Sequence, residues 1–325
     1  MANFPQFYEP LLTQLTSQPA QGFDAFDVGG WCPIVSVDPK AHQGIILVDR
    51  NVMTSTESDR DLSRSPMGEH KLITLGEPTT VEYQTYERAS PMDRYAKVNL
   101  ERAQDPLQFR ARKARHLAQV AKQKFYSDVA TLFTTAGNWA NTSTIAALTG
   151  GSGAKVNVLG TSNLIQDLLV AMEAFQDANG QMDPKHCVLN RRVLQFAART
   201  TALKNAIPDT QYGEQNEQAI VRYIESVTGM SVHVQTAAQN NALIWTDAIM
   251  LLPDNNVNAV MMDNGAQIDP CAGAVIHEDF AFAPGDLYIK EWDRPDGNVV
   301  NMACIKSYDV VVVDTNAAYL LTDCL

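Results

Sequence analysis

The sequence predicts an α+β fold that is organised around one long helix. Residues 105–136 have the apolar period of a single uninterrupted amphipathic helix. Strand-like segments at 44–49 and 79–88 enclose a long polar stretch, and residues 155–252 alternate helices with short strands. These three observations predict two folded bodies connected by a helical strut, with one extension that leaves the first body.

Residues 1–32 predict an N-terminal arm. The prolines and aromatic residues of FPQFYEPLL follow neither the period of a strand nor that of a helix. A segment of this kind becomes ordered through contacts with something else. PIVSV at 33–37 then alternates as a short strand, and it opens a unit that we expect to extend over residues 33–100.

The chain between the strands at 44–49 and 79–88 loses its apolar pattern. Over 49–71 it mixes acidic and basic residues in DRNVMTSTESDRDLSRSPMGEHK. An irregular segment of this length is unusual inside a compact domain, and an isolated two-stranded ribbon is marginally stable in water. We therefore expect a ribbon whose tip lies on a neighbouring subunit, with a surface loop of a monomer as the alternative. The candidate subunit-interface residues at the tip are Asp59, Arg60, Asp61, Arg64 and Lys71.

The helix over 105–136 has clear end signals. Asp105 can cap the first free amides, Pro106 fits the first helical position, and Gly137 offers a stop. At about 1.5 Å per residue the helix would be roughly 50 Å long. Its apolar stripe is expected to consist of Leu107, Ala111, Ala114, Leu117, Ala118, Ala121, Phe125, Val129 and Leu132.

Basic residues flank this apolar stripe on both sides, and no acid lies between Asp105 and Lys124. They are Arg110, Arg112, Lys113, Arg115, Lys122 and Lys124. One interpretation is that their long side chains cover the edge of a core while the charges stay in water. The other is that the helix turns a basic surface toward a polyanion.

A second body follows the strut. The Gly-rich stretch 138–160 predicts a connector, with GGSG at 150–153 as a flexible joint. Residues 253–297 are rich in turn signals and are expected to be irregular, whereas residues 298–325 read as strands that return to the first body. The expected helices are 162–180, 191–203 and 219–229, and the expected strands are 186–190, 231–236 and 242–252.

Composition excludes several classes of protein. The chain is 45% hydrophobic, which is typical of a folded protein, and its formal net charge of −12 argues against sequence-specific nucleic-acid binding. No apolar run approaches the roughly 20 residues that span a bilayer, and the N-terminus lacks the features of a secretory signal, so we expect a protein of the cytoplasm. Five dispersed cysteines predict reduced thiols.

No catalytic, cofactor or metal site is predicted. The six histidines have no metal-ligand spacing, GGSG lacks the Lys-Ser/Thr of a phosphate loop, and no nucleophile elbow occurs. Asp59 and Asp61 form a DxD sequence in a mixed-charge segment, which favours solvated salt pairs over Mg²⁺ binding. Active sites assembled in space are invisible to spacing, so an α/β enzyme with a site in 155–252 stays an alternative.

The order of these parts resembles the major capsid proteins of tailed bacteriophages, which have the Hong Kong-97-type fold. The resemblance lies in the layout of nearly the whole chain and in loose motifs. The matching segments are the strand 33–37 after an arm, the extended loop 44–88, the spine helix 105–136, an axial domain that includes VLNRRVLQFA and IESVTGMSVHVQTA, and the closing strands VVNMACIKSYDVVVVDTNAAYLL.

This resemblance implies an α+β capsid fold with a long spine helix, an extended two-stranded loop, a peripheral β-domain and an α/β axial domain. The implied domains are an arm (1–32), a short strand with the extended loop (33–100), the spine helix with the peripheral domain (101–154), an axial domain (155–299) and returning strands (300–325). Some members of the family cross-link through a lysine of the extended loop. Lys71 is the only lysine within 49–88 and no partner is evident, so no cross-link is expected.

The function implied by the resemblance is structural rather than enzymatic. Subunits would form hexamers and pentamers of an icosahedral virion shell, assembled in the host cytoplasm, with a separate scaffolding protein, a portal protein and double-stranded DNA bound without sequence specificity. No membrane and no cofactor are involved. Arg110, Arg112, Lys113 and Arg115 are then candidates for a basic inner surface. A nanocompartment shell that encloses a protein is an alternative within the same fold.

Overall fold

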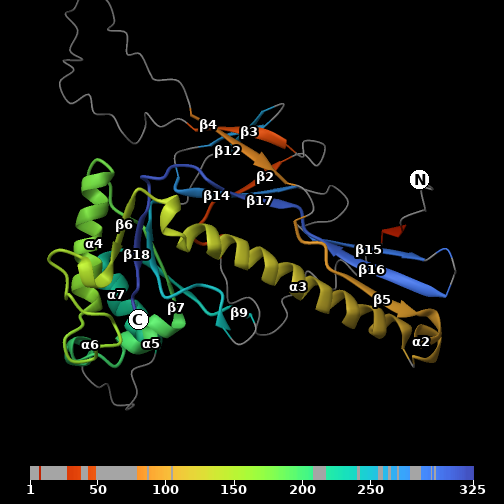
Figure 1. Ribbon diagram of the computed structural model, residues 1–325, viewed down its shortest axis with the longest axis horizontal. Coiled ribbons are helices and arrows are strands. Elements are labelled where there is room, and N and C mark those ends of the chain that lie inside the picture. Colours follow the sequence, from red (N-terminus) through yellow and green to blue (C-terminus); the bar gives the residue numbers. More distant parts are fainter. Residues whose placement is uncertain are drawn as a thin grey trace, which may run out of the picture.

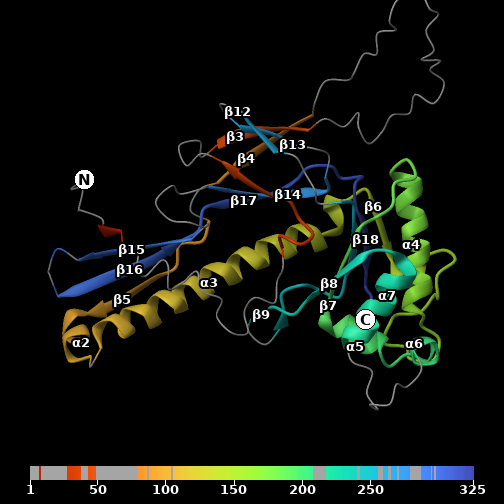
Figure 2. The ribbon, with the colours of Figure 1, turned by 180° about the vertical axis from the view of Figure 1, so that it is seen from behind.

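A computed structural model places one helix, α3 (Pro106–Thr134), along several sheets and toward a helical body at one end (Figures 1 and 2). The described residues are 7–8, 28–37, 43–48, 79–85, 88–103, 105–207, 217–239, 242–254, 259–262, 265–268, 271–278, 287–293, 295 and 298–325. Most of the predicted arm and the whole tip of the predicted ribbon lie outside them. The end of the arm, residues 28–32, contributes the buried Val28, Trp31 and Cys32 to the main core.

The predicted start of the long helix is confirmed. The Asp105 carboxylate accepts hydrogen bonds from the amides of Leu107 (3.0 Å) and Gln108 (3.1 Å), and Pro106 is the first helical residue. The helix ends at Thr134, before the predicted Gly137. Side chains satisfy its last carbonyls, because Asn138 Nδ2 donates to Leu132 O and Trp139 Nε1 donates to Phe133 O.

The buried stripe of α3 is rich in alanine. Small side chains let β16 and β17 approach the helix closely, and Phe125 stacks edge-on against Tyr308 at 4.9 Å between ring centres. Two ends of the predicted stripe are wrong: Leu107 is 49% exposed and Leu132 is partly buried, whereas Phe133 is buried. The buried residues are Ala111, Ala114, Leu117, Ala118, Ala121, Phe125, Val129, Ala130 and Phe133.

Two sheets, β1-β15-β16-β5 and β17-β14-β2, lie beside α3, and a third, β12-β13-β3-β4, packs on the second of these through contacts between β4 and β17. A short helix, α2 (Lys97–Arg102), precedes α3 at its far end (Figure 1). The strands are β1 (Phe7–Tyr8), β2 (Ile34–Val37), β3 (Gln43–Val48), β4 (Thr79–Gln84), β5 (Met92–Ala96), β12 (Ala259–Met262), β13 (Gly265–Ile268), β14 (Gly273–Glu278), β15 (Tyr288–Asp293), β16 (Val299–Ile305) and β17 (Tyr308–Val312).

The base of the predicted ribbon is confirmed as an antiparallel pair, with β3 and β4 in register from Gln43↔Gln84 to Val48↔Thr79. It is not isolated, because β13 pairs in parallel with β3. Asp309 of β17 fixes β4 as well: its carboxylate accepts from the Gln84 amide at 2.8 Å and pairs with Arg88 at 2.7 Å. The ribbon therefore starts from a four-stranded sheet that is anchored to the core.

The expectation that residues 253–297 are irregular is wrong. This segment contains β12 to β15, which pair with β2, β3, β16 and β17 beside the long helix. The turn-forming sequences lie between strands of four to six residues, so a short strand between two turn signals has too few positions to show a period.

The second body is a five-stranded sheet in the order β6-β18-β11-β7-β8 with four helices. Its sheet joins β6 of the expected connector to the last strand of the chain. Its strands are β6 (Asn141–Thr144), β7 (His186–Asn190), β8 (Ser231–Gln235), β11 (Ile249–Leu252) and β18 (Tyr319–Thr322), and its helices are α4 (Leu164–Ala178), α5 (Arg191–Ala197), α6 (Thr201–Ala206) and α7 (Glu217–Thr228); a two-stranded hairpin, β9 (Ala238–Gln239) with β10 (Ala242–Leu243), precedes β11.

Local details of this body correct several expectations. The GGSG segment is held in place, because the Ser152 amide and hydroxyl donate to the buried Asp167 at 2.5 and 2.8 Å. Asn163, rather than Ser162, caps α4. The helix expected over 191–203 breaks into α5 and α6, because Thr200 caps a new helix start. Of the closing strands, β16 and β17 return to the sheets beside α3, but β18 completes the second body.

Both faces of the five-stranded sheet of the second body are buried. Cys187, Leu189 and Ile249 face the core beneath the helices, whereas Val188 and Met250 belong to the core around α3. Because β7 and β11 are covered on both sides, each of their residues is buried. The two bodies therefore share the sheet as a common wall.

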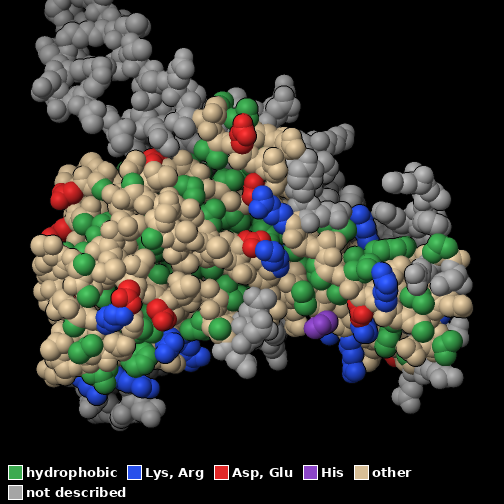
Figure 3. Space-filling view, in the orientation of Figure 1, with side chains coloured by type: hydrophobic (Ala, Val, Ile, Leu, Met, Phe, Trp, Pro, Cys, Tyr) green, Lys and Arg blue, Asp and Glu red, His purple; other side chains and the backbone are tan. Residues whose placement is uncertain are grey.

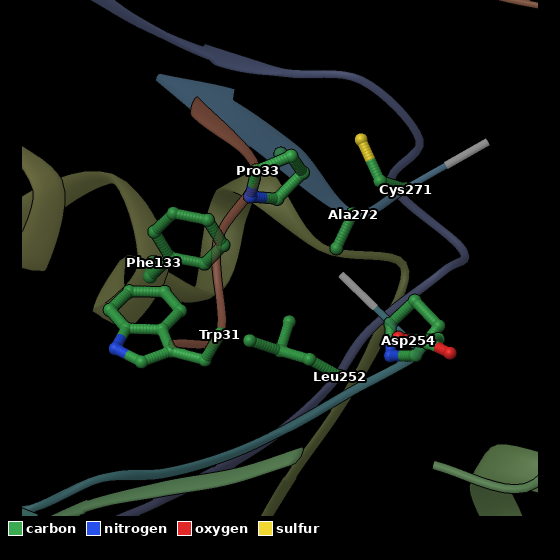
Figure 4. Close-up of a pocket in the computed structure, with 9 residues that line it drawn as sticks. Trp31, Pro33, Phe133, Leu252, Asp254, Cys271 and Ala272 are labelled. Atoms are coloured by element: carbon green, nitrogen blue, oxygen red, sulfur yellow. The ribbon is translucent and has the colours of Figure 1, made fainter. Parts of the chain in front are cut away.

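An aromatic cluster locks α3 against this wall. The Trp31 ring lies edge-on to Phe133 (4.9 Å) and Trp245 (5.6 Å), and Phe133 stacks on Trp139 at 5.5 Å. Figure 4 shows Trp31 and Phe133 beside Pro33, Leu252 and Ala272 around a cavity of about 10 Å³. A side chain at Gly273 would put its Cβ 2.9 Å from the Phe133 ring, so only glycine fits there.

The packing of α3 predicts the effect of a charge on its buried stripe. Leu117 is 3% exposed, so Leu117→Asp would bury an unpaired carboxylate. The substitution is expected to lower the free energy of unfolding by at least about 3 kcal/mol, so that no soluble subunit is recovered. Leu107→Asp is the matched control, because Leu107 is 49% exposed on the same helix. Soluble yield and thermal unfolding of the two variants provide the measurement. Equal stability of both variants would contradict the placement of the stripe.

Candidate functional site

The basic face of α3 is the candidate site that the structure describes. Lys and Arg side chains lie along the half of α3 nearer α2 in Figure 3. The four sequence-predicted residues of this face, Arg110, Arg112, Lys113 and Arg115, are on a rigid element because the opposite stripe of the helix is buried. Ion pairs with acidic side chains of the same chain determine which of the four are available to bind another molecule.

Arg110 and Lys113 are engaged within the chain. Arg110 Nε lies 3.4 Å from Glu291 Oε1, and Lys113 Nζ lies 2.6 Å from Asp93 Oδ2. The hydrogen bond from Lys113 lowers the pKa of Asp93 below its ordinary value. These two bases tie α3 to β15 and β5, which agrees with the interpretation that basic side chains cover the edge of a core.

The pair between Arg110 and Glu291 includes a third group. Tyr95 Oη donates to Glu291 Oε1 at 2.6 Å, and both residues are buried. Burial, followed by the carboxylate of Glu291, raises the pKa of Tyr95, so the phenol keeps its proton and acts as a donor. The group is a structural clamp between β5, β15 and α3.

Arg112 and Arg115 remain available. Both side chains are exposed, and in the part of the chain that the structure describes neither forms an ion pair. Lys124, farther along the helix, pairs with Asp128 at 2.5 Å, and Asp128 also accepts from Tyr308 Oη at 2.7 Å. Among the described residues, Arg112 and Arg115 are therefore the exposed arginine or lysine side chains of α3 that form no ion pair, whereas Lys122 is partly buried near Lys306.

The tip residues Asp59, Arg60, Asp61, Arg64 and Lys71 lie outside the described residues. Their role as subunit-interface residues stays a prediction. The structure places only the base from which they extend, at β3 and β4.

One lysine that sequence reasoning did not single out is buried in the first body. Lys306 is 2% exposed, and its Nζ lies 4.2 Å from the centre of the Phe125 ring. Burial, followed by the nearby charge of Lys122, lowers the pKa of Lys306 to about 7. No sequence signal marks it, since the burial arises from α3 packing over the connection between β16 and β17.

Two histidines that are distant in sequence meet on adjacent strands. His186 Nδ1 lies 3.0 Å from His233 Nε2, across the parallel pair of β7 and β8. Among the described residues there is no group of three or more side chains that could hold a metal ion.

The five cysteines are buried and none forms a disulfide. Burial raises the pKa of Cys187 to about 12, so this thiol is a poor nucleophile.

A groove of about 410 Å³ lies between α5, α7 and β8, in the range where an enzyme site was an alternative. Its two carboxylates have structural partners: Glu217 pairs with Arg191 at 2.9 Å, and Glu225 accepts from the Val232 amide at 3.2 Å. The residues that line it are Leu194, Glu217, Gln218, Val221, Arg222, Glu225, Val234 and Thr236. This set contains no nucleophile with an adjacent base.

Among the described helices, none has the length and apolarity to cross a membrane.

Solved structures with a similar arrangement include phage capsids. A phage-related protein from Bordetella bronchiseptica RB50 is 13% identical, with a TM-score of 0.66 over 98% of each chain. The mature capsid of bacteriophage PhiM1 is 11% identical, with a TM-score of 0.52 over 94% of this chain and 90% of that one. The chain has the Hong Kong-97-type capsid fold. The capsid of Myoviridae phage XM1 is also similar, at 13% identity and a TM-score of 0.50 over 94% of each chain.

Comparisons of sequence alone find no relative of this chain. No protein-family model matches the sequence, and no curated protein sequence matches it. The expected α+β class and the expected capsid fold are both confirmed. At these low identities the similarity concerns the fold, so the roles of individual residues depend on this chain's own contacts.

The buried lysine predicts a pH dependence of stability. Because the pKa of Lys306 is about 7 in the folded protein and 10.5 in its ordinary state, the unfolded chain binds more protons between these values. Folding stability therefore rises with pH across this window, by at most about 1.4 kcal/mol per unit from this group. Lys306→Met is expected to remove that contribution. The free energy of unfolding of the variant should therefore exceed that of the native protein by the largest amount at pH 7 and below.

Denaturant unfolding of both proteins at pH 6 to 10 measures this difference. Other titrating groups cancel when the two curves are subtracted. Lys122→Met serves as a control, because it removes a neighbouring charge on α3 and leaves the amine of Lys306 buried; most of the pH dependence should remain, since burial is the larger cause of the lowered pKa. A difference between Lys306→Met and the native protein that stays constant with pH would contradict the lowered pKa.

Proposed function

We propose that this protein is a major capsid protein, which assembles from many copies into hexamers and pentamers of an icosahedral shell around double-stranded DNA. The observation that carries the proposal is the capsid fold, which matches the solved capsids of phages XM1 and PhiM1 over at least nine-tenths of each chain. A shell protein needs surfaces for its copies and no active site. This agrees with a groove whose carboxylates have structural partners, and we propose that the protein is not an enzyme.

The exposed arginines of α3 suit an inner surface. Arg112 and Arg115 can neutralise phosphates without reading base edges, which gives binding that is independent of sequence. Arg110 and Lys113 contribute less, because Glu291 and Asp93 already neutralise them. The inner-surface role is therefore proposed for Arg112 and Arg115 rather than for all four predicted residues.

The ribbon suits a contact between copies. Its base is fixed by β13 and Asp309, so an extension from it would be presented in a constant direction. We propose that the tip residues Asp59, Arg60, Asp61, Arg64 and Lys71 meet a neighbouring subunit. Many modest contacts of this kind would add up in a closed shell, because each added subunit completes several interfaces.

The remaining partners follow from the same proposal. A shell of hexamers and pentamers with one DNA entrance needs a portal protein, and control of its curvature suits a separate scaffolding protein. The location would be the virion capsid, after assembly in the host cytoplasm. The domain boundaries at residues 32, 100, 154 and 299 stay proposals as well, although the pairing of β12 to β15 beside α3 favours an earlier end of the axial domain, near residue 254.

Electron microscopy of the expressed protein tests this function. The expected result is capsomers or closed shells, alone or when a scaffolding protein is coexpressed. The contents distinguish the alternatives: nucleic acid supports a virion shell, whereas an enclosed enzyme supports a nanocompartment. A strictly monomeric protein at high concentration, with a ligand in the groove between α5 and α7, would overturn the proposal in favour of an enzyme.

The inner-surface role predicts a change in salt dependence. Replacing Arg112 and Arg115 by Gln removes two phosphate contacts per subunit, so the slope of log affinity for double-stranded DNA against log salt should fall by about 2. The control variant, Lys185→Gln with Arg222→Gln, makes the same charge change at exposed residues of the second body and should leave the slope unchanged. Filter binding at several salt concentrations gives both slopes. Equal slopes for the two variants would contradict the role of α3.

A further inference from the structure

Charge is segregated over the helical layer of the second body. Residues 164–184, which form α4 and the turn after it, contain acids and no base. Residues 191–207, which form α5 and α6, contain bases and no acid. The acids are Asp167, Glu173, Asp177 and Asp183, and the bases are Arg191, Arg192, Arg199 and Lys204.

One member of each set is engaged inside the chain. Asp167 is buried and accepts hydrogen bonds from Ser152, and Arg191 pairs with Glu217 at 2.9 Å. The other three acids and three bases are exposed, and within the described ranges none of the six forms an ion pair. Asp177 and Asp183 accept hydrogen bonds from glutamine side chains of the same body, which leave their charge uncompensated. The charges of three acidic and three basic side chains therefore remain for external contacts.

Each set includes a partly exposed apolar side chain. Phe196 is half-buried, and the guanidinium carbons of Arg192 and Arg199 lie 5.9 and 5.7 Å from its ring centre. On α4, Leu169 is 38% exposed and lies at one end of a stripe of the helix, where Glu173 and Asp177 follow it at intervals of four residues. Apolar side chains bordered by charged ones are typical of a protein interface.

The two sets lie on different parts of the same layer. α4 packs against β11 and β18, whereas α5 packs against β7 and β8. Figure 3 shows Asp and Glu side chains at the edge over α4, and Lys and Arg side chains at the edge over α5 and α6. A single copy thus presents its acidic and basic faces separately.

We propose that the face formed by Arg192, Phe196, Arg199 and Lys204 binds the face formed by Leu169, Glu173, Asp177 and Asp183 of a second copy. Because two different faces meet, the contact is heterologous and repeats around a ring, which is the arrangement that a hexamer or pentamer needs. Opposite charges favour this pairing and disfavour contacts between like faces. The inference rests on the proposed shell function and assigns residues to a contact within its rings.

Charge reversal on either face, and then on both, tests the contact. Arg192→Glu with Arg199→Glu should raise the concentration needed for assembly at least tenfold, and Glu173→Arg with Asp177→Arg should do the same. The chain that carries all four changes restores opposite charges and should assemble at close to the native concentration. Lys185→Glu with Arg222→Glu, a charge change of the same size elsewhere on this body, should have no effect. Light scattering and sedimentation measure assembly, and circular dichroism checks the fold.

The outcomes separate the inference from the function on which it rests. If the native protein assembles and both reversed variants assemble equally well, the inference is wrong and the shell function stands. If the native protein stays monomeric, both are wrong. If reversal at Arg192 and Arg199 weakens DNA binding and leaves assembly intact, the basic face is a nucleic-acid surface instead. Should that variant fail to fold, Arg192→Gln with Arg199→Gln and the acidic-face variant provide the same readout.

Discussion

The contact between α3 and the sheet of the second body is the constraint on which the rest of the structure depends. Val188 and Met250 lie on the side of that sheet that faces α3, and Cys187 and Leu189 lie on the side that faces α4 to α7. One layer of strands therefore closes two cores. The aromatic cluster of Trp31, Phe133, Trp139 and Trp245 fills the junction. Because burial of apolar surface is the main stabilising contribution to folding, a shared wall couples the two bodies into one unit.

The packing of α3 on the strands of the first body explains why a long helix can serve as a strut. An isolated helix gains little stability in water, and most of it comes from packing of an apolar face. Alanines on the buried stripe bring β16 and β17 close to α3, while Tyr308 and Asp128 add a hydrogen bond across the contact. The exposed stripe is then free to carry charge, which is how Arg112 and Arg115 remain available on a rigid support.

The sequence predicted the elements that are long enough to show a regular apolar period or that have clear end signals. The start of α3 followed from Asp105 and Pro106, and the strand at 186–190 and the stop of α7 near Gly229 were also evident. It failed where contacts distant in sequence decide the structure. The strands of residues 253–297 are too short to show a period, and Phe133 replaces Leu132 in the core because Gly273 and Trp31 leave room for its ring.

Charge follows the same division between local and distant information. The basic residues of α3 were visible as a pattern, but only the fold shows that Glu291 and Asp93, from other strands, neutralise two of them. Among the charged residues of α4, α5 and α6 and the turn after α4, the fold engages Asp167 and Arg191 and leaves the others without an ion pair within the described residues. Exposed ion pairs contribute little to the stability of a folded chain. The subunit therefore loses little free energy of folding when its exposed acids and bases are left without partners. Those charges are then available for the one setting in which they repeat, a contact between many copies of the same chain.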